Sequence, residues 1–158
     1  MATIGREGCT GFQAIFGDEE SSVRFLVQLP GSAVRMSRSA FLRATKTMPC
    51  FCNLMHAYVQ AFMEQVLVSG ACNGAHSVKQ RLARWLLMMD DRNDDNLLRI
   101  TQTLLAEMLG VQRPTITNAV REFEKAGLIA PGQRQIAVLQ GLLPVSYTHL
   151  TLPTNREV

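Results

Sequence analysis

The sequence predicts an α+β fold, with short strands first, a long helix next, and two short helices followed by a β-hairpin at the end. Three observations lead to this prediction. Glycines divide residues 3–17, apolar residues recur with helical spacing over residues 48–72, and two apolar stripes of helical spacing meet at Gly110.

The first part of the chain is predicted to consist of short strands and turns. Residues 3–17 contain Gly5, Gly8 and Gly11, and glycines at such short spacing are typical of turns. Residues 23–29 and 33–36 are rich in apolar and β-branched side chains, which favour strands. A sheet with so few strands is expected to have open edges.

The stretch from Met48 to Cys72 is predicted to be one long helix. Four apolar side chains recur at steps of four, three and four residues, which forms a heptad-like seam able to pair with the same helix of a second subunit. Packing of the stripe inside one subunit is the alternative. The seam residues are Met55, Val59, Phe62 and Val66.

A further helix is predicted from Ser77 to Met89, with Trp85 as a core residue. The other inward residues of this helix are Val78, Leu82 and Met89. A polar run over residues 90–96 follows as a linker. Its acidic side chains are expected to lie away from any polyanion.

Residues 100–129 are predicted to form two amphipathic helices that meet at Gly110. A glycine can adopt the left-handed conformation that ends a helix and turns the chain. The second helix begins near Gln112, because Pro114 then falls in its first turn, where a missing N–H costs little. This layout is that of a helix-turn-helix, a motif that reads DNA. The inward residues are Leu104, Leu105, Met108, Leu109, Ile116, Ala119, Val120 and Phe123.

Hydrogen-bond donors gather where the second helix begins, the end that enters a major groove. Arg113 is the first candidate for a bidentate contact with guanine, and Asn118 is the second candidate, for an adenine or a phosphate. Nearby hydroxyl and amide groups suit phosphate contacts, which fix the register without reading sequence. The candidate DNA-binding residues are Thr101, Gln102, Thr103, Gln112, Arg113, Pro114, Thr115, Thr117, Asn118, Arg121 and Arg134.

A β-hairpin wing is predicted after the second helix. Residues 130–134 have the composition of a turn, and residues 135–139 alternate like a short strand. Arg134 is therefore expected near the tip of the wing.

The alternative function is that of a dimerisation or protein-interaction fragment. Helix packing alone explains the apolar stripes, and residues 99–134 carry five basic against three acidic residues, which an ordinary surface can show. Glu122 and Glu124 on the second helix permit this alternative. The salt dependence of duplex binding separates the two functions, because neutralised phosphates give a steep inverse dependence.

Residues 76–139 resemble the C-terminal half of the Crp/Fnr family of bacterial transcription regulators. The segments SVKQRLARWLL, the helix-turn-helix and GLIAPGQRQIAVL occur in the family's order. The resemblance implies a cytoplasmic homodimer whose partners are double-stranded DNA and RNA polymerase. It divides the chain into a sensor fragment (1–47), a dimerisation helix (48–75), a winged helix-turn-helix (76–143) and a tail (144–158).

The resemblance also bears on specificity and on ligands. In that family the recognition helix usually begins with a Ser/Arg/Glu-like trio and has an arginine one turn later. The corresponding residues here are Gln112, Arg113 and Pro114 for the trio and Asn118 for the arginine. Pro114 has no side-chain carboxylate that could accept a hydrogen bond from a cytosine, as the family's glutamate does. The preferred operator is therefore expected to differ from the best-known operator of the family.

Residues 1–47 resemble the end of the family's cyclic-nucleotide-type β-roll, of which most strands are missing. The glutamate that binds ribose in that family corresponds to Arg6, and the Arg-Ser pair is absent near Ser21. We therefore predict no cyclic-nucleotide control and no cofactor, and residues 5–8 are predicted to be a plain turn.

Other function classes find little support. The four cysteines form no C-x-x-C pair and follow no signal peptide, so free thiols are expected, and the three histidines lack metal-ligand spacing. Phosphate-loop and nucleophile-elbow motifs are absent, so no enzyme is predicted. The net charge is +3 and the apolar content is 47%, with no run of about 20 apolar residues.

The tail over residues 144–158 resembles read-through into cloning-vector sequence. Together with a start inside the sensor domain, it leads us to expect an incomplete reading frame.

Overall fold

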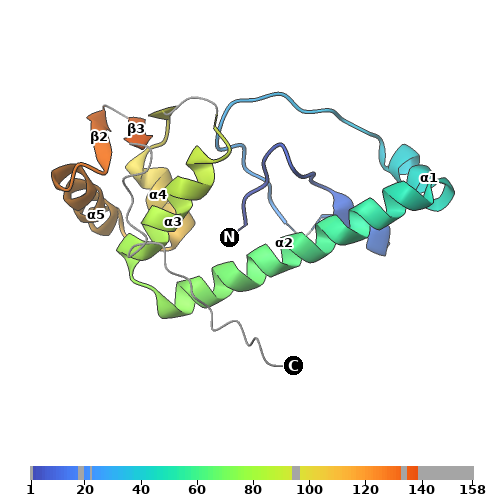
Figure 1. Cartoon of the computed structure of the whole chain (residues 1–158), viewed down its shortest axis with the longest axis horizontal. Coiled ribbons are helices and arrows are strands. Elements are labelled where there is room, and N and C mark those ends of the chain that lie inside the picture. Colours follow the sequence, from blue (N-terminus) through green and yellow to red (C-terminus); the bar gives the residue numbers. More distant parts are fainter. Residues whose placement is uncertain (1, 18–19, 22, 94–96, 133–134, 139–158) are drawn as a thin grey trace. The chain divides into compact units, whose positions relative to one another are not determined.

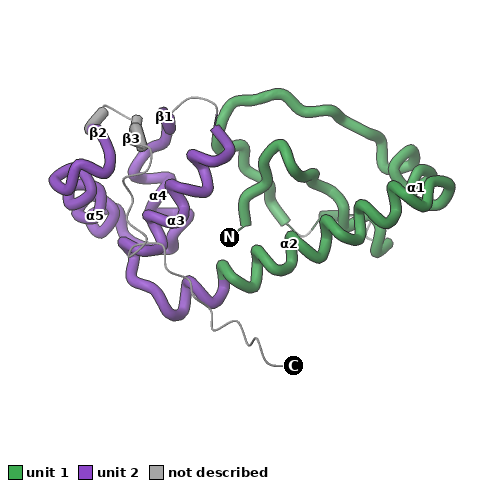
Figure 2. Tube along the Cα trace, in the orientation of Figure 1, with its two compact units in different colours: residues 1–69 green, residues 70–158 purple. Residues whose placement is uncertain are grey.

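The computed structural model of the chain divides into two compact units, residues 1–69 and residues 70–158, which Figure 2 shows in green and purple. The structure describes residues 2–17, 20–21, 23–93, 97–132 and 135–138. The predictions for Arg134 and for the tail over residues 144–158 therefore fall outside the described residues.

The first unit begins with a short 3-10 helix, η1 (Phe12–Phe16), and continues to helix α1 (Arg38–Thr47). Gly11 and Gly17 flank η1 with φ angles of 79° and 96°, a left-handed conformation that glycine adopts without strain. Ser37 caps α1, because its hydroxyl accepts a hydrogen bond from the Ala40 N–H at 3.2 Å.

The strands predicted over residues 3–17, 23–29 and 33–36 are wrong for the residues that the structure describes there, because η1 and irregular chain replace them. Most side chains between residues 23 and 36 are exposed. A strand requires a neighbour for its N–H and C=O groups, and no described residue of this unit provides one. The helix α1 was missing from the prediction.

Helix α2 (Pro49–Ala75) confirms the long helix predicted over this stretch and runs from the first unit into the second (Figure 1). Within the first unit, Phe12 packs edge-on against Tyr58 and Phe62 of α2, with ring centroids 5.5 and 5.1 Å apart. The Tyr58 hydroxyl donates to the Cys9 carbonyl at 2.9 Å. This aromatic cluster fixes η1 against the helix.

Helix α3 (Val78–Asp90) confirms the helix predicted from Ser77. Its first turn has a capping box, in which the Ser77 hydroxyl accepts from the Gln80 N–H and the Gln80 side chain accepts from the Ser77 N–H. Trp85 is buried, as predicted for a core residue.

The second unit also contains helices α4 (Gln102–Leu109) and α5 (Arg113–Lys125) and an antiparallel sheet of three strands. The strands β1 (Leu97–Leu98), β2 (Ile129–Gly132) and β3 (Gln135–Val138) have the order β1-β3-β2. Ile129 of β2 pairs with Val138 of β3, and Leu98 of β1 pairs with Ile136 of β3.

The strand predicted over residues 135–139 agrees with β3 over the described residues 135–138, but the first half of the hairpin differs from the prediction. Residues 130–132 were predicted to belong to the turn, whereas they form part of β2. The strand β1 was not predicted, because it is only two residues long and follows an acidic run.

The core of the second unit lies between its helices and the sheet. Six large side chains from α3, β1, α4 and α5 have exposed fractions under 2%. They are Leu82, Leu86, Leu98, Leu105, Ile116 and Phe123. This core holds the outer face of α5 in a fixed orientation relative to α4.

Candidate nucleic-acid interface

The turn between α4 and α5 has the predicted geometry. Gly110 has a φ angle of 64° and donates its N–H to the carbonyls of Ala106 and Glu107 at the end of α4. The Val111 N–H donates to the Ala106 carbonyl at 3.0 Å. These bonds satisfy the last carbonyls of α4 and direct the chain into the next helix.

Helix α5 begins where the sequence indicated. Gln112 is the N-cap residue in an extended conformation, and Pro114 lies in the first turn. The inward stripe is confirmed, since Ile116, Ala119 and Phe123 are among the buried residues of this helix.

The outer face of α5 is open to solvent. The exposed candidates are Gln112, Arg113, Pro114, Thr115, Asn118 and Arg121. The guanidinium groups of Arg113 and Arg121 make no hydrogen bond or ion pair within the described part of the chain. Two arginines held on a buried scaffold, with their donors unused, suit phosphates and base edges.

The candidates at the start of α4 have a different environment. Thr101 is the N-cap residue, and its hydroxyl accepts from the Leu104 N–H at 3.2 Å. Thr103 is exposed. Gln102 and Thr117 contact each other, because the Thr117 hydroxyl donates to the Gln102 Oε1 at 2.7 Å. The structure therefore brings the start of α4 and the middle of α5 together at one edge of the helix-turn-helix.

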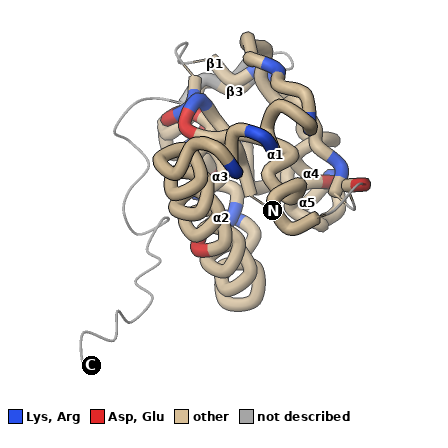
Figure 3. The backbone as a smooth tube through the Cα atoms, turned by 90° about the vertical axis from the view of Figure 1, so that its right-hand side faces the viewer, with Lys and Arg blue, Asp and Glu red and all other residues tan. Residues whose placement is uncertain are grey.

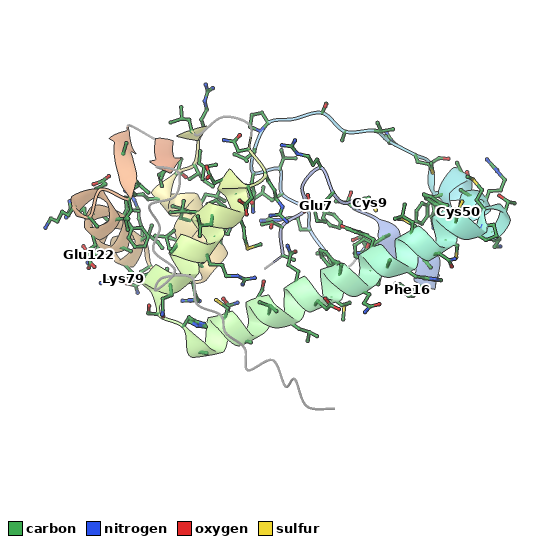
Figure 4. The ribbon with its side chains drawn as sticks, in the orientation of Figure 1. Glu7, Cys9, Phe16, Cys50, Lys79 and Glu122 are labelled. Atoms are coloured by element: carbon green, nitrogen blue, oxygen red, sulfur yellow. The ribbon has the colours of Figure 1, made fainter. Side chains whose placement is uncertain are left out.

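Two polar links from α3 to the helix-turn-helix were not predicted. Lys79 forms an ion pair with Glu122 of α5, and Figure 4 shows the two labelled side chains next to each other. Arg81 donates from Nη1 to the Leu109 carbonyl at 3.2 Å, at the end of α4. Sequence reasoning had no signal for these contacts, since their partners are 43 and 28 positions apart.

The predicted seam on α2 has a graded environment. Met55 is buried with an exposed fraction of 8%, Val59 and Phe62 are half-buried, and Val66 is 39% exposed. Phe62 contacts Phe12 within the same unit. One end of the stripe thus packs inside the first unit, and the other end is open.

The charge pattern of α2 is unusual for an exposed helix. Glu64 is its single Asp, Glu, Lys or Arg in 27 residues, and the helix is drawn almost entirely in the neutral colour of Figure 3. In the part of the chain that the structure describes, no helix has the length and hydropathy that a membrane span requires.

The described residues offer no arrangement for a metal, since no three His, Cys, Asp or Glu side chains among them converge. All four cysteines are free thiols, and burial raises the pKa of Cys9 above its ordinary value. Residues 5–8 form a turn, closed by a hydrogen bond from the Gly8 N–H to the Gly5 carbonyl at 3.2 Å. The plain turn predicted there is confirmed.

The second unit thus has the architecture of a helix-turn-helix domain followed by a β-hairpin. Residues 80–141 match the model of the Crp-like helix-turn-helix domain. No curated protein sequence matches the chain significantly.

Solved structures of that class resemble the chain in fold. FixK2 from Bradyrhizobium japonicum matches 64% of this chain and 53% of its own, with 20% identity and a TM-score of 0.58. A protein from Eubacterium rectale described as a regulator of the Crp/Fnr family matches 65% of this chain and 47% of its own, with 24% identity and a TM-score of 0.50. The chain spans about half the length of these proteins.

Proposed function

We propose that the chain is the DNA-binding portion of a Crp/Fnr-type transcriptional regulator, with α5 as its recognition helix. The observation that carries this proposal is the exposed start of α5, where Arg113 and its neighbours stand on a buried scaffold. In this proposal Arg113 contacts a guanine in the major groove, and Asn118 contacts an adenine or a phosphate. The hairpin β2–β3 acts as the wing beside the adjacent phosphates.

The proposed functional state is a homodimer that forms through α2. A helix with a single charged residue is poorly suited to stay in water over its whole length. The open part of its stripe contains Val59, Val66 and the exposed Met63, which share one face. In the proposed dimer, the two recognition helices bind half-sites about one helical turn apart.

The resemblance supplies the remaining parts of the proposal. Residues 1–47 form a sensor fragment without cyclic-nucleotide control, residues 48–75 the dimerisation helix, and residues 76–143 the DNA-binding domain. The protein acts in the cytoplasm without catalysing a reaction. RNA polymerase stays a prediction of the resemblance, because no contact among the described residues bears on it.

The proposal is tested by duplex binding of the full chain and of Arg113→Ala at several salt concentrations. We expect binding that weakens steeply with salt, and a loss of roughly 1–3 kcal/mol at the preferred site in the variant. The control is Arg35→Ala, which removes an exposed arginine of the first unit and should leave binding unchanged. Equal losses on all sequences reassign Arg113 to a phosphate. Weak binding that is insensitive to salt favours the protein-interaction fragment instead.

A further inference from the structure

A single side-chain contact between α4 and α5 lies at the edge of the candidate interface. The Thr117 hydroxyl is 2.7 Å from the Gln102 Oε1 and 3.1 Å from the Arg113 carbonyl oxygen. A hydroxyl has one proton, so the shorter contact to the amide oxygen is the stronger of the two. Both side chains are half-buried, which limits competition from water.

This contact determines how the Gln102 amide is oriented. A glutamine side chain ends in an acceptor oxygen and a nitrogen with two donor hydrogens. Because Thr117 occupies the oxygen, the nitrogen is directed to the other side of the amide group. In the described part of the chain, the Nε2 of Gln102 has no acceptor.

The surroundings of this nitrogen suit an anion. Gln102 is the first residue of α4, where the N–H groups of the first turn have no intrahelical acceptor. The Thr101 hydroxyl accepts from the N–H of Leu104, so the N–H groups of Gln102 and Thr103 stay available at the start of the helix. Backbone and side-chain donors at one helix start can share the oxygens of a single phosphate.

We propose that Thr117 is a positioning residue, which holds Gln102 so that its amide nitrogen donates to a phosphate oxygen of bound DNA. This inference rests on the proposed DNA-binding function. It also changes the role that the sequence indicated for Thr117, because the hydroxyl acts through Gln102 and does not itself contact DNA. Holding the long glutamine side chain before binding reduces the rotamer entropy that binding must remove.

The proposal makes a specific prediction about DNA affinity. A phosphate contact carries no sequence information, so its loss should weaken preferred and mixed-sequence duplexes by the same factor. The amide is neutral, so its loss should leave the slope of affinity against salt concentration unchanged. These two signatures separate it from a base contact and from an arginine–phosphate contact.

The experiment is a double-mutant cycle on the full chain, with Thr117→Val, Gln102→Ala and the double variant bound to both kinds of duplex. We expect Thr117→Val alone to weaken binding about three- to tenfold, and to cause no further loss when Gln102 is already alanine. Thr117→Ser keeps the hydroxyl and should bind within about twofold of the original protein. Gln102→Glu keeps the acceptor but puts a negative charge at the phosphate, and should weaken binding more than Gln102→Ala.

A loss on Thr117→Val that is equally large in the Gln102→Ala background overturns the proposal, because the threonine then acts independently of the glutamine. Thermal unfolding of each variant shows whether a loss of binding follows from a loss of folded protein. Intact duplex binding with zero coupling overturns this inference alone. Failure of the original protein to bind any duplex overturns the proposed function, and the inference with it.

Discussion

The two units of the chain differ sharply in how they use their apolar residues. In the second unit helices and strands bury a continuous set of large side chains, among them Leu82, Leu105 and Phe123 with exposed fractions of 0–1%. Among the described residues, every exposed large hydrophobic side chain lies in the first unit, from Phe16 to Leu67. Apolar content alone does not make a core, because only side chains removed from water stabilise a fold.

The different burial of apolar side chains in the two units affects how firmly each unit holds its surface residues. The second unit holds the start of α5 rigidly, and a rigid scaffold is what a DNA-reading surface needs. The first unit depends on a small aromatic cluster around Phe12, with much of its remaining apolar surface exposed. We therefore expect substitutions in the two units to have separable effects.

The largest effect is expected for Phe123→Ala in the second unit. The ring is 1% exposed, and its removal should lower the free energy of unfolding by about 3–5 kcal/mol. Chemical denaturation followed by the fluorescence of Trp85, the one tryptophan of the chain, measures this change in the same unit. Phe16→Ala is the control, since that ring is 64% exposed and its loss should matter little. Similar losses for both would contradict the contrast between the units.

A smaller effect is expected for Gly8→Ala in the first unit. A Cβ atom at this position would lie 2.6 Å from the Tyr58 Oη, so the tyrosine ring must shift. We expect the protection of α2 amides around Tyr58 against hydrogen exchange to fall by about 1–2 kcal/mol. Gly31→Ala is a matched control, because a Cβ there has no atom within 4 Å. Unchanged protection in Gly8→Ala would show that the aromatic cluster does not stabilise this unit.

The sequence predicted the second unit much better than the first. Gly110 and Pro114 mark the turn and the start of α5 through their own backbone chemistry, so local sequence was sufficient there. Residues 23–36 have strand-like composition, but a strand also depends on a neighbour that composition does not reveal. The contacts of Thr117 and Lys79 join residues far apart in sequence, and only the packed structure brings them together.

The ion pair between Lys79 and Glu122 is expected to contribute at most about 1 kcal/mol to the stability of the second unit. Both side chains are close to half exposed, and salt screens such pairs. A double-mutant cycle with alanine at both positions, followed by denaturation at low and high salt, measures the coupling. A coupling that does not decrease with salt would contradict a surface interaction.

The smallest effect is expected for Asp90→Asn at the end of α3. Burial, and then the charge of Asp91, raise the pKa of Asp90 above its ordinary value. The folded protein therefore binds this proton more tightly than the unfolded chain does, and stability falls as the pH rises through the raised pKa. The variant should be as stable as the original protein at low pH and more stable at neutral pH, which denaturation at the two pH values measures. A variant that is less stable at neutral pH would contradict this sign.

The most direct test of the central claim is selection of bound sequences from a random duplex pool, with the original chain and with Arg113→Ala. The account predicts a palindromic preferred sequence with half-sites about one helical turn apart, and a relaxed preference at one base position in the variant. A pool that shows no enriched sequence with either protein would contradict α5 as a recognition helix.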